Sequence, residues 1–232
     1  EDMKVFLDPG HGGKDPGAMG HELKEKDLTL AIALKVGSIL KDHGLQVHYS
    51  RTTDVYVSLE DRAKRANQFN ANIFISIHIN SAKNISARGV ETFHYPGSTE
   101  GKGLATAIQN SLVSSNIFSH DRKVKTANHA VTRLTKMPAC LVELGFIVNT
   151  LDAQLLRTKQ PKIAQAIAQG ALSYLDIAYK GGTSMASKDQ PSPWARVAWE
   201  WAAKNKIIDG TRPQDVPSRE EVITILYNAR GK

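Results

Sequence analysis

The segment Asn72–Ile79 (NIFISIHI) constrains the fold more than any other part of the chain. It is short and nearly continuous in apolar residues, and we interpret it as a central strand that is apolar on both faces, as in a sheet covered on both sides. A second apolar run, Lys4–Leu7, ends in a turn rich in proline and glycine. We interpret this run as a buried strand that leads into a loop.

Strand-like and helical segments alternate along residues 1–179. From Asp27 onward the apolar residues fall on one broad helical face, with Asp27 as the predicted N-cap and Gly44 just past the predicted end. The capping box Ser58–Asp61 (SLED) predicts a helix through Phe69. The other expected elements are strands at Leu45–Ser50 and Gly89–Tyr95, helices at Glu100–Ser115 and Pro161–Tyr179, and two strands within His129–Leu144 around a turn at Lys136–Pro138.

This alternation predicts an α/β fold, with a twisted, mostly parallel sheet flanked by helices. In such sheets ligands bind just beyond the carboxyl ends of the strands. The functional residues are therefore expected where predicted strands end.

Residues 180–193 (KGGTSMASKDQPSP) have little to bury and predict a linker. Beyond them, residues 194–232 hold all three tryptophans and predict two short helices, the second opening at the capping box Ser218–Glu221. We therefore predict a large domain over 1–179 and a small helical domain over 194–232, whose core is marginal on its own.

Charge and cysteine content exclude several classes of protein. Lys and Arg total 30 against 23 for Asp and Glu, a net charge of +7, but the basic residues are scattered and only 6% of residues are aromatic. This argues against a nucleic-acid partner and leaves an anionic cell-surface polymer compatible. No apolar run approaches the ~20 residues that cross a bilayer, so no membrane partner is expected. The single cysteine, Cys140, excludes a disulfide framework and a cysteine-rich metal module.

The first candidate site is the glycine-rich segment Asp8–Gly17 (DPGHGGKDPG), which follows a predicted strand. A dinucleotide-binding fingerprint fails because Asp15 stands where its third glycine belongs, and a phosphate-binding P-loop fails because Lys14 is followed by Asp15. What remains is His11 at a strand end, in a turn that lets other groups approach its ring closely. By itself the segment favours a purely structural turn over a ligand site.

The second candidate is the charged segment His21–Asp27 (HELKEKD). It superficially resembles the zinc motif H-E-x-x-H, but position 25 is glutamate and the segment precedes the helix, so the one-face geometry is lost. Either one carboxylate here is a lone metal ligand or the segment is a solvated loop.

Two further residues stand out in predicted strands. His78 ends the central strand, where it is either a buried core histidine or a functional group. Glu143 lies among apolar residues and would be costly to bury unpaired, so we expect it to be paired, protonated or close to a metal. Two histidines and a carboxylate form a common catalytic zinc set, and a separate glutamate in apolar surroundings suits a general base.

A family resemblance adds to these signals. Five segments occur in order over about residues 4–178: VFLDPGHGGKDPGA (Val5–Ala18), KEKDLTLAIALKV (Lys24–Val36), SRTTD (Ser50–Asp54), FISIHINS (Phe74–Ser81) and MPACLVELGFIVN (Met137–Asn149). In this combination the chain resembles the zinc-dependent N-acetylmuramoyl-L-alanine amidases of type 3, which cut bacterial peptidoglycan.

The resemblance implies that His11, Glu25 and His78 bind Zn²⁺ and that Glu143 is the catalytic glutamate. Glu25 is preferred to Glu22 because the family's glutamate directly precedes a Lys-Asp pair and a helix. The implied reaction is hydrolysis of the amide between N-acetylmuramic acid and the L-alanine of the stem peptide by zinc-activated water. Cys140 replaces an aliphatic residue, with no expected effect on the chemistry.

Three more residues are candidates for substrate contacts: Asn80, His94 and His129. For His129 the alternative is a neutral structural histidine.

The tail resembles a segment of the S-layer-homology type, and similar tails follow amidase domains in some phage endolysins. This implies anchoring to the cell wall, with an anionic secondary polymer as a possible partner. Trp194, Trp199 and Trp201 would offer stacking faces for sugars, or would simply form the small core. Only one repeat-like unit is present, which leaves binding by the tail alone in question.

Two alternatives stay open. The same zinc site would serve a carboxypeptidase or endopeptidase that cuts within the stem peptide, and a non-catalytic wall-binding protein would not need Glu143. No signal peptide opens the chain. We therefore expect a phage or prophage endolysin released through a holin, or a secreted bacterial autolysin whose signal has been removed, acting at the bacterial cell wall.

Overall fold

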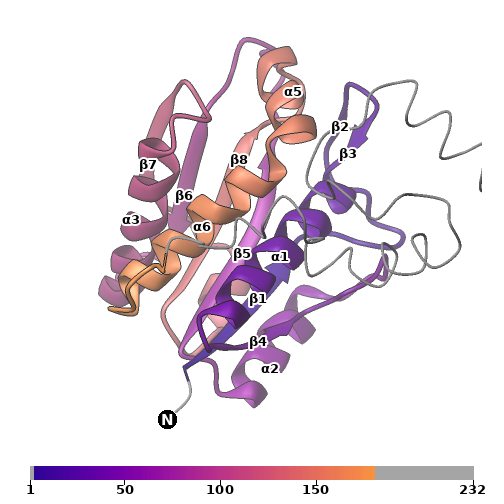
Figure 1. The fold of residues 1–232 in the computed structure, drawn as a ribbon. Coiled ribbons are helices and arrows are strands. Elements are labelled where there is room, and N and C mark those ends of the chain that lie inside the picture. Colours follow the sequence, from indigo (N-terminus) through magenta and orange to yellow (C-terminus); the bar gives the residue numbers. More distant parts are fainter. Residues whose placement is uncertain (1–2, 181–232) are drawn as a thin grey trace, which may run out of the picture. The chain divides into compact units, whose positions relative to one another are not determined.

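The computed structural model describes residues 3–180, which form a six-stranded sheet with helices on both faces (Figure 1). The strand order is β4-β1-β5-β8-β6-β7. These strands span Lys4–Pro9 (β1), Gln46–Tyr49 (β4), Ile73–Asn80 (β5), Val90–His94 (β6), Asp121–Thr126 (β7) and Ala139–Phe146 (β8). A separate two-stranded sheet pairs β2 (Met19–Gly20) with β3 (Leu23–Lys24).

The sheet is mostly parallel. β1 pairs in parallel with β4 and β5, and β5 pairs in parallel with β8. β6 runs antiparallel to β8, and the edge strand β7 runs parallel to β6. The predicted α/β fold, a mostly parallel sheet flanked by helices, is therefore confirmed.

Helices divide between the two faces of the sheet. They are α1 (Glu25–Asp42), α2 (Leu59–Phe69), α3 (Thr99–Ser114), α4 (Ala130–Leu134), α5 (Thr150–Thr158) and α6 (Gln160–Tyr174). α1, α3 and α6 bury their apolar residues in the larger core, as seen in Figure 1 where α1 and α6 cross the sheet. α2 and α4 contribute Ala66 and Val131 to a smaller cluster on the other face, around Phe6, Phe74 and Leu141.

The central strand β5 has two chemically different faces. Its isoleucines all lie in the larger core, as predicted. The opposite face begins with Phe74 but continues with Ser76 and His78. The expectation of two apolar faces is therefore wrong for the carboxyl half of one face, and this polar end of the strand is where the candidate ligands gather.

The start of the first helix also differs from the expectation. α1 begins at Glu25, its N-cap is Lys24 without a side-chain cap, and Asp27 lies within the first turn. Acidic residues there interact favourably with the helix dipole, which explains why Asp27 resembles a cap in the sequence. By contrast, the predicted cap of α2 is confirmed, because the Ser58 hydroxyl accepts a hydrogen bond from the backbone amide of Asp61 at 3.1 Å.

The segment His129–Leu144 holds one short helix and one strand, α4 and β8, where two strands are predicted. Its β-branched residues favour a strand, but Val131 packs into the smaller cluster beside α2, and tertiary packing overrides that preference. β7 and α5 are absent from the predicted elements, and the last helix ends at Tyr174 rather than Tyr179.

The predicted tail lies outside the described residues. This covers residues 181–193 of the predicted linker and the whole of 194–232, with Trp194, Trp199 and Trp201. Within residues 3–180, no helix is both long enough and apolar enough to span a bilayer.

Candidate metal centre

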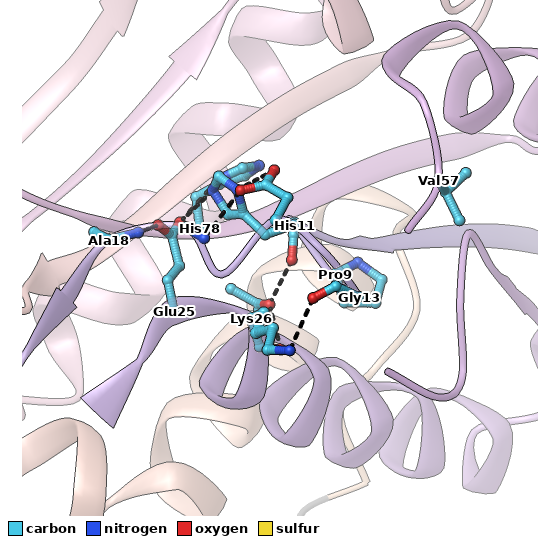
Figure 2. A network of polar contacts seen from close by, with 12 residues as sticks. Pro9, His11, Gly13, Ala18, Glu25, Lys26, Val57 and His78 are labelled. Carbon is cyan, nitrogen blue, oxygen red and sulfur yellow. Dashed lines mark hydrogen bonds and ion pairs between the residues drawn. The ribbon is translucent and has the colours of Figure 1, made fainter. Parts of the chain in front are cut away.

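Three predicted ligands meet at the carboxyl end of the parallel strands (Figure 2). His11 follows β1, Glu25 is the first residue of α1, and His78 lies near the end of β5. One potential ligand atom from each lies within 4.8 Å of the other two. His11 Nε2 and His78 Nδ1 are 3.1 and 3.0 Å from the same carboxylate oxygen, Glu25 Oε1.

Glycine makes the approach of these side chains possible. A Cβ atom at Gly10 would overlap the ring of His78, and one at Gly17 would lie 2.6 Å from Glu25 Oε2. Gly17 also has a φ of +66°, which favours glycine. The glycine-rich turn in the sequence therefore reflects close packing around a cluster of polar side chains rather than a phosphate-binding loop.

A buried ion pair anchors the loop that carries His11. Asp8 accepts a hydrogen bond from Arg62 Nη1 at 2.7 Å. It also accepts from the hydroxyls of Ser50 and Ser76. Burial alone would raise the pKa of Asp8, but the Arg62 charge and these hydrogen bonds hold it below its usual range. Arg62 Nη2 donates to the carbonyl oxygen of His11 at 2.7 Å, so the same cation fixes the backbone of a candidate ligand, whose φ is +59°.

The Glu25 carboxylate is buried, yet its environment favours the charged form. It accepts hydrogen bonds from the backbone amides of Ala18 (2.8 Å) and Ile79 (2.9 Å). Burial alone would raise the pKa of Glu25, but His11 and His78 hold it well below its usual range. Burial alone would lower the pKa of each histidine, and Glu25 outweighs it and raises both. The group thus attracts positive charge at its centre.

Asp15 is a candidate positioning residue that the sequence reasoning missed. Its Oδ2 lies 2.8 Å from His11 Nδ1, the ring nitrogen that faces away from Glu25. A carboxylate on the far nitrogen of a ligating histidine fixes the ring and its tautomer. The spacing of four residues between His11 and Asp15 is visible in the sequence. Asp15 served there only to exclude the two phosphate-binding motifs.

Replacing Asp15 with Asn should weaken Zn²⁺ binding about 10- to 100-fold, because groups that hydrogen bond to ligating histidines typically contribute that much. The half-exposed Asp15 also accepts from the Gly17 amide at 3.1 Å, a bond that the Asn oxygen can retain. Competition with a chromogenic chelator measures the affinity. Unchanged affinity with an unchanged melting temperature would show that Asp15 does not orient the ligand.

The donor set of the group suits zinc. Zn²⁺ binds imidazole nitrogens and carboxylate oxygens, and catalytic sites commonly use three protein ligands and leave a fourth position open. Two imidazoles and one charged carboxylate are what His11, Glu25 and His78 supply. These residues therefore fit a catalytic zinc ion.

Glu143 lies beside this group on β8, directly opposite His78 on one neighbouring strand and Glu91 on the other. Its Oε2 is buried and has no hydrogen-bond partner among the described residues. Burial raises the pKa of Glu143 to about 7, with the charges of Glu25 and Glu91 adding to the effect and His78 opposing it. A carboxyl group in this state can take up and release a proton near neutral pH.

Asn80 and His129 border the same face of the sheet. The side-chain amide of Asn80, two residues after His78, donates to Glu91 Oε1. His129 is the N-cap residue of α4, its ring meets the ring of Phe93 edge-on at 5.3 Å, and its Nε2 is buried without a partner among the described residues. Burial lowers the pKa of His129, and the His78 charge lowers it further.

His94 is not brought to the site. It pairs with Cys140 across β6 and β8, three residues along each strand from the Glu91–Glu143 pair. The odd spacing puts its side chain on the opposite face of the sheet, where it lines a surface hollow with Lys102 of α3. Strand parity therefore separates His94 from the candidate ligands, and its contact with substrate stays a prediction. Cys140 lies in the larger core, and burial raises the pKa of its thiol.

The chain is similar in sequence and fold to known proteins of one family. A family model described as N-acetylmuramoyl-L-alanine amidase matches residues 5–173. A sporulation-specific N-acetylmuramoyl-L-alanine amidase of Bacillus subtilis is 42% identical over 183 residues, covering 76% of this chain and 68% of that protein. An endolysin of Bacillus phage SPP1 is 37% identical over 246 residues, covering 95% and 89%. The crystal structure of an N-acetylmuramoyl-L-alanine amidase from Clostridium difficile 630 superposes with a TM-score of 0.72 at 41% identity, covering 75% and 97%.

Proposed function

Because the chain belongs to the N-acetylmuramoyl-L-alanine amidase family and is a peptidoglycan hydrolase, we propose that it works with zinc held by His11, Glu25 and His78 and with Glu143 as its general base. The bond cleaved joins the lactyl group of N-acetylmuramic acid to the L-alanine of the stem peptide. The observation that carries the assignment is the meeting of the three ligands beside the buried Oε2 of Glu143, which has no partner among the described residues.

The chain's own residues divide the work of the reaction. Zinc at such a site supplies Lewis acidity, which polarises a carbonyl and lowers the pKa of water from ~15.7 to near 7. Glu143 takes a proton from the attacking water at Oε2 and returns it to the nitrogen of L-alanine as that amine leaves. A pKa near the working pH suits both transfers, because the same group must first accept the proton and then release it.

Of the two proposed substrate contacts, His129 and Asn80, only His129 has a buried side-chain atom without a partner among the described residues. The buried Nε2 of His129 is free to hydrogen bond with the substrate beside Glu143. The Asn80 amide is already engaged by Glu91, so its contribution is to hold Glu91 and the rim of the site in place.

Cleavage within the stem peptide is the competing reaction, because a zinc site with a general base serves both chemistries. Mass spectrometry of products from purified peptidoglycan separates them. We expect free stem peptides that begin with L-alanine, produced by the metal-loaded protein and lost when a chelator removes the metal. Shortened stems still attached to muramic acid would reassign the enzyme as a peptidase. Products that survive verified metal removal would reject the zinc assignment.

We further propose that residues 194–232, preceded by the linker 180–193, hold the enzyme on the cell wall, with an anionic secondary polymer as the ligand. The alignment with the phage endolysin covers 95% of the chain and so extends past residue 173, which supports a tail shared with an endolysin. The anionic polymer is proposed from the net charge of +7 alone.

If the tail binds the wall through its tryptophans, Trp199→Ala should lower the fraction of the full chain that co-sediments with purified walls. Turnover of a soluble muramyl-peptide should be unchanged, because the amidase site is untouched. Walls stripped of secondary polymer should retain neither protein. Equal sedimentation of the variant and the parent would reject the role of Trp199, and full binding to stripped walls would reject the polymer.

A further inference from the structure

Next to Glu143 lies a second buried carboxylate, Glu91 of β6, which the reaction described above does not use. The side chain of Glu91 is 5% exposed, and Glu91 pairs directly with Glu143 across the two strands. It forms ion pairs with Lys125 Nζ and, at 3.3 Å, with Arg122 Nε. One carboxylate therefore faces two cations.

Arg122 is held in place with part of its guanidinium open. Its Cζ lies 4.8 Å from the centre of the Phe146 ring, and its Nε is engaged by Glu91. The side chain is 30% exposed, and within residues 3–180 neither Nη1 nor Nη2 has a hydrogen-bond partner. A stacked, ion-paired arginine with two free nitrogens is pre-organised to bind a carboxylate at its open edge.

We propose that Arg122 binds a carboxylate of the stem peptide and selects stems whose second residue carries a free α-carboxylate. This assignment rests on the proposed amidase function, because it needs the scissile amide to lie between the metal group and Glu143. The lactyl carboxyl of muramic acid is consumed in that amide, so the carboxylates near the cut belong to the peptide. Arg122 is ion-paired with Glu91, whose strand lies about 4.8 Å from the strand of Glu143. Because a peptide advances about 3.5 Å per residue, the residue after L-alanine can come within reach of Arg122.

The test uses two synthetic N-acetylmuramoyl peptides that differ only at the second residue, which is D-glutamate linked through its γ-carboxyl or its α-carboxamide form. We expect the protein to prefer the free carboxylate about 10- to 100-fold in kcat/KM, the range of a charge-assisted hydrogen-bonded pair. Arg122→Gln should lose this preference, because its kcat/KM falls for the carboxylate substrate. For the carboxamide substrate kcat/KM should change less than about twofold. An unchanged ratio would overturn the assignment.

Controls separate recognition from folding and metal loss. Lys162→Gln removes one positive charge from an exposed position on α6, across the sheet, and should retain the full preference. Arg122→Lys keeps the charge without the planar fork and should give an intermediate ratio. Zinc content and melting temperature of each variant are measured alongside.

A further measurement needs no variant. The dipeptide L-alanyl-γ-D-glutamate should inhibit the unaltered protein at least about 10-fold more strongly than its α-carboxamide form. Equal inhibition by the two dipeptides would also overturn the assignment. Failure of the unaltered protein to cut either muramoyl peptide at the amide to L-alanine would instead reject the proposed function, so the two failures are distinguishable.

Discussion

Glu143→Gln is expected to lower kcat at least about a thousandfold and to leave Zn²⁺ bound, because the change removes a general base without removing a ligand. The amide is nearly isosteric with the carboxyl group, but it cannot accept the proton of the attacking water. Glu143 Oε2 has no partner among the described residues, so no structural hydrogen bond of that oxygen is lost. Product release from a soluble muramyl-peptide measures the rate, and elemental analysis measures the metal.

Glu22→Gln is the matched control for this variant. Glu22 is an exposed glutamate three residues before Glu25, and it stands outside the group of candidate ligands. This change should leave both the rate and the zinc content as they are. Full activity of Glu143→Gln would remove Glu143 from the mechanism, and loss of zinc would show that it is needed to bind the metal.

The sequence is sufficient to predict the two histidine donors, because each stands at or just past the end of an apolar strand. Glu25 opens a helix from a charged segment, and only the family resemblance singles it out. His11 and His78 are 67 residues apart, yet both follow buried segments that are recognisable from composition alone. Their meeting depends on the parallel pairing of β1 with β5, which sets Pro9 opposite Ile77. General rules for parallel sheets place functional groups at this edge, so the pairing follows once the fold class is known.

The surroundings of the donors are harder to predict, because they depend on strand parity and on charged segments without an apolar pattern. β7 (DRKVKT) is an edge strand dominated by charged residues, so no hydrophobic alternation marks it. Neither this strand nor Arg122 within it is therefore predicted from the sequence. His94 lies within a correctly expected strand, but a strand's facing is fixed only by its register with its neighbours. The sequence shows that side chains alternate between the two faces of a strand, but it does not show which set of side chains faces the site.

His11→Ala should abolish stoichiometric zinc binding and, with it, activity. The loss of affinity should exceed about 10- to 100-fold, the effect typical of losing a hydrogen-bond partner of a ligand, because a ligand itself is removed. The variant alone would leave one ambiguity, since His11 has a φ of +59° and alanine is strained in that region. His11→Asn resolves it, because asparagine tolerates a left-handed backbone conformation.

His21→Ala is the matched control, since His21 is an exposed histidine with a φ of +50° and lies outside the candidate ligand group. It carries the same kind of backbone strain but should keep its zinc. Elemental analysis after desalting gives the stoichiometry, and thermal unfolding with and without added Zn²⁺ gives an independent measure, because a ligand that binds only the folded state raises the melting temperature. The zinc-dependent rise should persist in His21→Ala and vanish in both His11 variants. Undiminished metal content in His11→Asn would exclude His11 as a ligand, and the Arg62 hydrogen bond to its carbonyl would then serve the backbone alone.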